Sequence, residues 1–417
     1  MILNEGVKYS RYIFKRAAFL SIVFSPFAAY SLNLGISISI DRFFLLISLG
    51  SLFACMLFQN KTQKITLFYV FIIFYLLFVS YLNSSFEFSG LLSYVLALSY
   101  FIVTYYYFYE VKSWEKIQTL LSIWTFIFLL FAGWALYNQL ILKNLVYSDP
   151  LGIEYSDPVH RKTMMLNGRL FLPYASAPFL AFVCGFIFIW NKIRENIYHV
   201  NRWESNFISI SSIVILFLTQ SRGPLYSLVV CLSFYYAMKF IIRREIKFSF
   251  LILIVFSLAV CGYVVYSFHE VIFSSRLIPS LESILQSRHA DLRLEALEIY
   301  SNFSTFNLFL GHGTGYYSLV GNAPYSFMSY LTVLIELGLI GLFLFLIITF
   351  LPTLFICFKI LRNNNVISIN DSGIIALNFY IAFCHIFYEY KTLVPLWILL
   401  GLLASISSKG KIIKNVY

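Results

Sequence analysis

Long apolar runs separated by short polar stretches repeat along the whole 417-residue chain. The runs contain about 17 to 25 residues, which is the length at which a helix crosses the hydrocarbon core of a bilayer. A membrane-spanning strand would instead show about ten residues of alternating polarity. The pattern therefore predicts twelve transmembrane helices, near 17–33, 42–58, 66–82, 91–109, 118–138, 173–190, 206–220, 224–241, 248–267, 326–358, 373–389 and 393–407.

Lysine and arginine gather at the N-terminus, at the C-terminus and in every second loop between these spans. Such a bias marks the cytoplasmic side of a membrane protein. We therefore expect both termini to be cytoplasmic, which agrees with an even number of spans. The residues that carry the bias are Lys8, Arg11, Lys15, Arg16, Lys61, Lys64, Lys112, Lys116, Lys192, Arg194, Arg202, Arg243, Arg244, Lys247, Lys409, Lys411 and Lys414.

Composition supports the same fold class. Hydrophobic residues make up 60% of the chain, charged residues only 12%, and the mean hydropathy is +0.80, which excludes an ordinary soluble domain. The net charge of +11 follows from membrane topology, so we expect no nucleic-acid partner. All six cysteines lie inside apolar runs and behave as small hydrophobic residues. We predict an all-α polytopic membrane protein in which residues 1–417 form a single domain.

Two loops, near 139–172 and 268–325, are too long to be simple connectors, and both fall on the predicted extracytoplasmic side. The second contains "ILQSRHADLRLEALEIYSNF", in which Leu285, Leu292, Leu297 and Ile299 recur at roughly helical spacing. Apolar residues on one side and charged residues on the other predict an amphipathic helix on the membrane surface.

Arg222 interrupts an otherwise apolar stretch, "ILFLTQSRGPLYSLVV", and is followed by Gly223 and Pro224. Proline suits the first turn of a helix, so Gly223 and Pro224 predict a break with Arg222 at a helix start. Helix N-termini offer unpaired N–H groups and partial positive charge, so an added guanidinium favours an anion. The alternative is an arginine that snorkels to the interface from a tight turn.

Further basic residues fall in the same outer loops. Arginine binds phosphate oxygens in pairs and keeps its charge, so these loops are suited to the phosphate groups of a lipid carrier. The outer basic residues are Arg161, Lys162, Arg169, Arg222, Arg276, Arg288 and Arg293.

Three segments together resemble the O-antigen polymerase and ligase superfamily. They are the turn Ser221-Arg222-Gly223, the segment "RLEALEIYSNFSTFNLFLGHGTGYYSLV" with its three closing glycines, and "APYSFMSYLTVLIELGLIGLFLFL". The resemblance covers roughly residues 130–360. The glycines are also compatible with a plain turn, and the run from Glu336 to Gly341 with close helix packing.

The resemblance implies glycosyl transfer outside the cytoplasm, in the inner membrane of a bacterium, from a polyprenyl-diphosphate-linked oligosaccharide. Membrane lipids are expected partners, and a regulator of chain length is a candidate partner. The chain contains no Asp-x-Asp pair and its histidines are scattered, so we expect no metal and no other cofactor. Arginines would then stabilise the diphosphate leaving group.

Individual roles follow from this implication. We assign the diphosphate to Arg169, Arg222 and Arg293, with Arg288 or Arg293 closing from the surface helix. Candidates for accepting the proton of the acceptor hydroxyl are His289, Asp291, Glu298 and His312. For each of these four, a plain loop residue is the competing interpretation.

Three functions stay open. Ligases of this superfamily typically show a His-Asn pair just before the Tyr-Leu that opens the span after the large loop. This chain reads Met328-Ser329 before Tyr330-Leu331, and His312 lies too far upstream to occupy that position. The departure favours a polymerase over a ligase that transfers polymer to lipid A core. A flippase for the same lipid-linked oligosaccharide is the alternative from a different class.

Overall fold

The computed structural model describes residues 2–27, 31–33, 37–59, 64–83, 87–111, 114–140, 170–174, 176–197, 202–243, 288–321, 328–363, 367–388 and 393–408. Its elements are α1 (Ile2–Phe24), η1 (Ser25–Phe27), β1 (Ser31–Asn33), β2 (Ser37–Ser39), α2 (Ile40–Gln59), α3 (Lys64–Leu82), α4 (Phe88–Glu110), α5 (Trp114–Leu140), α7 (Ala177–Ile197), α8 (Arg202–Leu218), α9 (Arg222–Arg243), α13 (Arg288–Ser301), α14 (Thr305–Leu310), α15 (Tyr316–Val320), α16 (Ser329–Asn363), α17 (Ile369–Phe387) and α18 (Val394–Ser408).

The predicted fold class, an all-α polytopic membrane protein, is confirmed. Within the described ranges, seven helices are long and apolar enough to cross a membrane: α3, α4, α5, α7, α9, α16 and α17. The apolar helix α18 is shorter. Each predicted span after the first overlaps a helix, apart from 248–267, which lies outside the described residues.

The first predicted span, 17–33, is wrong in its second half. Helix α1 begins at Ile2 and ends at Phe24, and a short turn containing Pro26 follows. Proline has no N–H to donate and therefore does not continue a helix. Beyond it, β1 and β2 pair antiparallel, with Leu32 opposite Ile38. The apolar run that looked like one span is a helix followed by a small hairpin.

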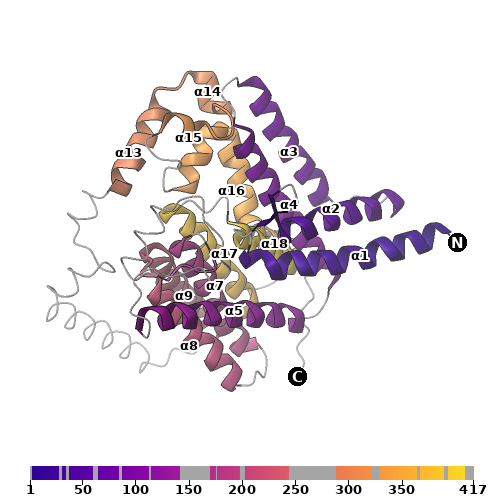
Figure 1. Ribbon diagram of the computed structural model, residues 1–417, viewed down its shortest axis with the longest axis vertical. Helices are drawn as coiled ribbons and strands as arrows, with labels where there is room; N and C mark the ends of the chain where they lie inside the picture. The colour runs from indigo at the N-terminus through magenta and orange to yellow at the C-terminus, as the bar shows by residue number, and fades with distance from the viewer. Residues whose placement is uncertain are drawn as a thin grey trace.

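Helix α18 lies at the centre of the bundle (Figure 1). Its side chains from Leu396 to Ala404 are almost completely buried. A Cβ atom at Gly401 would lie 2.5 Å from the carbonyl oxygen of Phe101 in α4, so the two helices touch backbone to backbone. Small residues permit such close approach, which is how membrane helices gain packing energy. The neighbouring helices are arranged around this core.

Contacts separate the helix ends into two groups. We call one group the Phe387 end: the first turns of α7, α9 and α16, the last turns of α8 and α17, and α13 beside them. We call the opposite group the charged end: the last turns of α4, α7 and α16 and the first turns of α8 and α17. Helices α13, α14 and α15 gather together beside one end of α16 (Figure 1).

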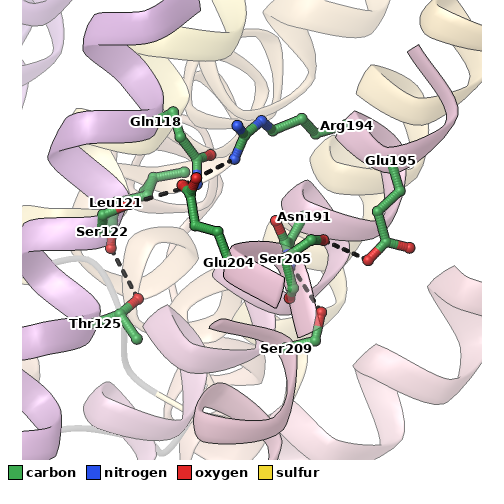
Figure 2. Close-up of polar contacts among 10 residues, drawn as sticks. All are labelled: Gln118, Leu121, Ser122, Thr125, Asn191, Arg194, Glu195, Glu204, Ser205 and Ser209. Carbon is green, nitrogen blue, oxygen red and sulfur yellow. Dashed lines mark hydrogen bonds and ion pairs between the residues drawn. The ribbon is translucent and has the colours of Figure 1, made fainter. Parts of the chain in front are cut away.

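At the charged end, ion pairs join α1 to α4, α7 to α8 and α16 to α17. Figure 2 shows part of it, where Arg194 and Gln118 point at Glu204 of α8. Asn191 of α7 donates to the Ser205 carbonyl and to Ser209 in α8, at 2.6 and 2.8 Å. Buried polar side chains cost free energy unless they are hydrogen-bonded, so these contacts fix the α7–α8 pair.

The predicted amphipathic helix is present as α13, but its buried face differs from the expected one. Leu292 and Ala296 are buried with Ile299 beside them, packed against α15 and α16, whereas Leu297 is 48% exposed. Leu285 lies outside the described residues. The buried face of α13 packs against Tyr317, Leu331 and Ile335. The spacing of the leucines alone did not predict which face this would be.

Candidate active site

Arg222 is the first residue of α9, as the sequence predicts. The break itself, however, lies in Thr219–Ser221, whereas Gly223 and Pro224 are already helical. The hydroxyl of Thr219 donates to the carbonyl of Leu216 at 2.6 Å and accepts from the N–H of Ser221 at 3.3 Å. Gln220 has a φ of +52°, an uncommon conformation for a residue with a side chain. The turn therefore fixes where α9 starts.

Gly223 is needed for close packing. A Cβ atom added to it would lie 2.5 Å from the Cβ of Phe387, the last residue of α17. Real Cβ atoms do not approach that closely, so a larger residue would push α9 away from α17. The ring of Tyr226, one turn further along α9, meets the Phe387 ring edge-on at 6.4 Å between centroids. The turn that carries Arg222 is thus seated on the end of α17.

Arg293 reaches the same residue from α13. Its Nη2 atom donates to the carbonyl oxygen of Phe387 at 3.2 Å. The side chain is half-buried, and this burial lowers the pKa of the guanidinium from its ordinary value. Arginine nevertheless stays charged at any pH a cell meets. The contact ties α13 to α17 and holds a cation beside the start of α9.

Two further helices meet the same corner. The hydroxyl of Ser329, at the start of α16, donates to the carbonyl of Tyr388 at 3.1 Å. Ser176, just before α7, donates to the phenol oxygen of Tyr388 at 3.3 Å. Leu170 bonds through its N–H to the carbonyl of Leu218 at 3.1 Å, which joins the segment before α7 to the end of α8. The Phe387 end is therefore a junction of several chain segments.

The other predicted site residues divide into three groups. Arg169 lies outside the described residues. Arg288 and His289 begin α13, but their side chains are not among those described. His312 is described and belongs to a second cluster, built on α14, α15 and the first part of α16. Of the three arginines assigned to the diphosphate, Arg293 donates to the Phe387 carbonyl, and Arg222 precedes Gly223, which packs on the Phe387 Cβ.

His312 is held between aromatic rings. It stacks on Tyr316 at 4.3 Å between centroids and meets Phe303 edge-on at 4.2 Å. Its Nε2 atom lies 3.0 Å from the side-chain nitrogen of Asn307. Burial lowers the pKa of the imidazole below its ordinary value of 6.5. The neutral form, which accepts protons, is therefore favoured near neutral pH.

Glycines position His312 against a break in α16. Gly338 has a φ of +65° inside this helix, which opens its hydrogen-bond ladder. The N–H of His312 donates to the carbonyl of Ile335, and that of Gly313 to the carbonyl of Glu336. Added Cβ atoms at Gly311 and Gly338 would each lie 2.3 Å from backbone oxygens of the other segment. These glycines therefore serve both turn formation and close packing, the two interpretations that the sequence offered.

Sequence reasoning missed the tyrosines that support this break. The phenol of Tyr94 in α4 donates to Oε2 of Glu336 at 2.7 Å, and the Glu336 side chain is almost fully buried. Tyr75 of α3 donates to the freed carbonyl of Leu337 at 2.7 Å. Glu336 is a charged residue inside a predicted span, but nothing in the sequence distinguishes these two from the chain's other tyrosines.

A guanidinium at a helix start and a second one on a facing helix are suited to an anion with several oxygens. Helix α9 contributes the partial positive charge of its first turn, and Arg222 and Arg293 contribute fixed charge and paired donors. The neutral imidazole of His312 is suited to proton transfer. The Phe387 end is therefore suited to anion stabilisation, and the separate His312 cluster is suited to proton transfer.

Comparison with known proteins gives one family. A family model described as O-antigen ligase matches residues 207–346, from α8 to the first half of α16. The matched part contains Arg222, Arg293 and His312, and it contains the break at Gly338. No curated protein matches the chain. The resemblance seen in the sequence is confirmed for this part.

Proposed function

From the match of residues 207–346 to the family model described as O-antigen ligase, we propose that the protein polymerises lipid-linked oligosaccharide repeat units into a surface polysaccharide. The donor would be a polyprenyl-diphosphate-linked oligosaccharide on the extracytoplasmic face of a bacterial inner membrane. The product would be O-antigen or a related polymer.

In the proposed reaction, the bond between the anomeric carbon and the diphosphate oxygen breaks. A hydroxyl oxygen of the acceptor sugar forms the new bond to that carbon, and its proton passes to a base. Arg222 and Arg293 would stabilise the negative charge that develops on the leaving diphosphate. His312 is our candidate for the base, because its imidazole is neutral and lies in the same family-matched region.

The observation that carries this proposal is the meeting of both arginine-bearing segments at Phe387. Gly223 packs against its Cβ, and Arg293 donates to its carbonyl. A diphosphate is small, so its stabilisation requires charges from one place rather than from scattered loops. The proposed orientation, with the Phe387 end outside, follows from the lysine and arginine bias of the opposite loops.

The choice of polymerase rests on the residues before Tyr330-Leu331. The hydroxyl of Ser329 donates to the carbonyl of Tyr388, which is a structural contact, and the side chain of Met328 is not a base. The ligase function keeps a place as the second candidate because the matched family is described by that name.

A deletion strain separates these functions. We expect its lipopolysaccharide to carry a single repeat unit on the core, because ligation continues when polymerisation stops. Bare core together with accumulated long polymer would identify a ligase, and bare core without surface polymer would identify a flippase. Complementation with the intact gene provides the control for each pattern.

A further inference from the structure

A cavity lies at the charged end, away from the arginines described above. Its volume is about 260 Å³, and its walls come from the first turn of α3, from α4, from the last part of α16 and from the end of α18. Ligand pockets have volumes of roughly 300 Å³ and more. A cavity of this size suits a single polar head group rather than an oligosaccharide.

Two lysines give the cavity its charge. Lys64, the first residue of α3, is exposed at its mouth, and Lys359 of α16 forms part of its wall. Lys359 lies 3.4 Å from a carboxylate oxygen of Asp371, and that carboxylate also accepts from Ser368. The described lining of the cavity therefore holds two lysines and no carboxylate of its own, which favours an anion.

The hydroxyl groups in the lining form hydrogen bonds within the protein, so the two lysines are the groups suited to bind a ligand. Tyr105 donates to the hydroxyl oxygen of Ser408 at 3.3 Å, and Ser408 donates to the carbonyl of Ser405 at 3.0 Å. Ser407 donates to the carbonyl of Leu403 at 2.8 Å. The first turn of α3 adds backbone N–H groups that have no partner within the helix, with the partial positive charge of a helix start.

The surface beside the cavity is apolar. On α16, next to Lys359, Phe358 is 66% exposed and Leu361 is 74% exposed, and on α3 Leu67 is 60% exposed. Apolar side chains with this exposure on membrane-spanning helices face acyl chains. An anion bound at the lysines could therefore keep a hydrocarbon tail against these residues.

We propose that this cavity binds a phosphate group, and that an anionic phospholipid supplies it. The cavity would hold the phosphate between Lys64 and Lys359, with the acyl chains along α3 and α16. Positively charged protein surfaces next to membrane-spanning helices attract anionic lipids in this way. The proposal concerns the opposite end of the bundle from Phe387 and does not depend on the proposed function.

Lipid binding to the purified full-length protein tests this site. Native mass spectrometry would measure retention of phosphatidylglycerol, with phosphatidylcholine as a zwitterionic comparison, for the unmodified protein and for Lys64→Gln, Lys359→Gln and the double variant. One lysine near a membrane surface contributes enough that we expect about a fivefold loss of phosphatidylglycerol affinity for Lys64→Gln and about thirtyfold for the double variant. Lys116→Gln, an exposed lysine in the first turn of α5, is the matched control and should change nothing.

Inorganic phosphate in the same titration identifies the source of the anion. Failure of millimolar phosphate to displace phosphatidylglycerol would support the lipid, whereas displacement would support a free phosphate as ligand of the same two lysines. Lys64→Gln decides the case even if removal of Lys359 disturbs Asp371. Equal retention of phosphatidylglycerol by the unmodified protein and by Lys64→Gln would overturn the proposal.

Discussion

The two ends of the helix bundle use their cations differently. At the charged end, Arg194 pairs with Glu204 (Figure 2) and Lys359 pairs with Asp371, so ion pairs link neighbouring helices. At the Phe387 end, Arg293 donates to a main-chain carbonyl, and Arg222 begins a helix. The ion pairs of the charged end link helices, whereas the proposed function assigns Arg222 and Arg293 of the Phe387 end to the diphosphate.

The sharpest way to break this contrast is to remove one cation from each end. Arg222→Ala should abolish polymer formation, with a loss of about 10²- to 10³-fold in transfer rate, because leaving-group charge is no longer stabilised. Arg222→Lys should recover part of the activity, since it restores charge but not the planar fork. The measurement is chain length on gels of lipopolysaccharide, with membrane protein level checked by immunoblot.

Arg194→Ala is the matched control at the charged end. It removes an exposed ion pair, which contributes little to stability, so chain length should stay normal. If Arg222→Ala also left chain length normal, the assignment of the Phe387 end would be lost.

A smaller effect is expected from the packing that seats Arg222. Gly223→Ala forces a Cβ against Phe387, and overpacking of this kind costs about 1–3 kcal/mol or displaces the helix start. We expect shortened polymer and a lowered melting temperature. Gly133→Ala in α5, where an added Cβ meets nothing within 4 Å, should be neutral. Equal behaviour of the two variants would remove the packing argument.

Local signals in the sequence predicted part of this site. The start of α9 at Arg222 and the presence of α13 follow from residues within a few positions of each other. Phe387, by contrast, is 94 residues from Arg293, and Tyr94 is 242 residues from Glu336. Such partners depend on how helices pack, which a single sequence does not encode in any short pattern. The hairpin after α1 was missed because its strands, Ser31–Asn33 and Ser37–Ser39, are too short to give a clear alternating pattern.

The pH profile should sharpen the role of His312. Its pKa is lowered by burial, so the imidazole stays neutral as the pH falls to about 6.5 and becomes protonated only below that. Activity that requires the neutral base should therefore hold across neutral pH and decline in acid through the lowered pKa. His312→Asn should be slower and should lose this acid limb. A variant with the original profile would assign His312 a structural role in its aromatic cluster.

Chelation should have the smallest effect of all. If arginines stabilise the diphosphate, then EDTA should leave transfer by the purified protein unchanged within experimental error. Inhibition by EDTA that a divalent ion reverses would show that a metal ion, and not the arginines alone, stabilises the diphosphate.

The central claim is that Arg222 and Arg293 act on one diphosphate, and a double-mutant cycle tests it most directly. Affinity for polyprenyl diphosphate would be measured in detergent for the unmodified protein, Arg222→Ala, Arg293→Ala and the double variant, so that inactive proteins can still be compared. Residues that share a ligand are coupled, and we predict an interaction energy of about 1 kcal/mol or more. Strictly additive losses, or affinity unchanged by either substitution, would contradict the account.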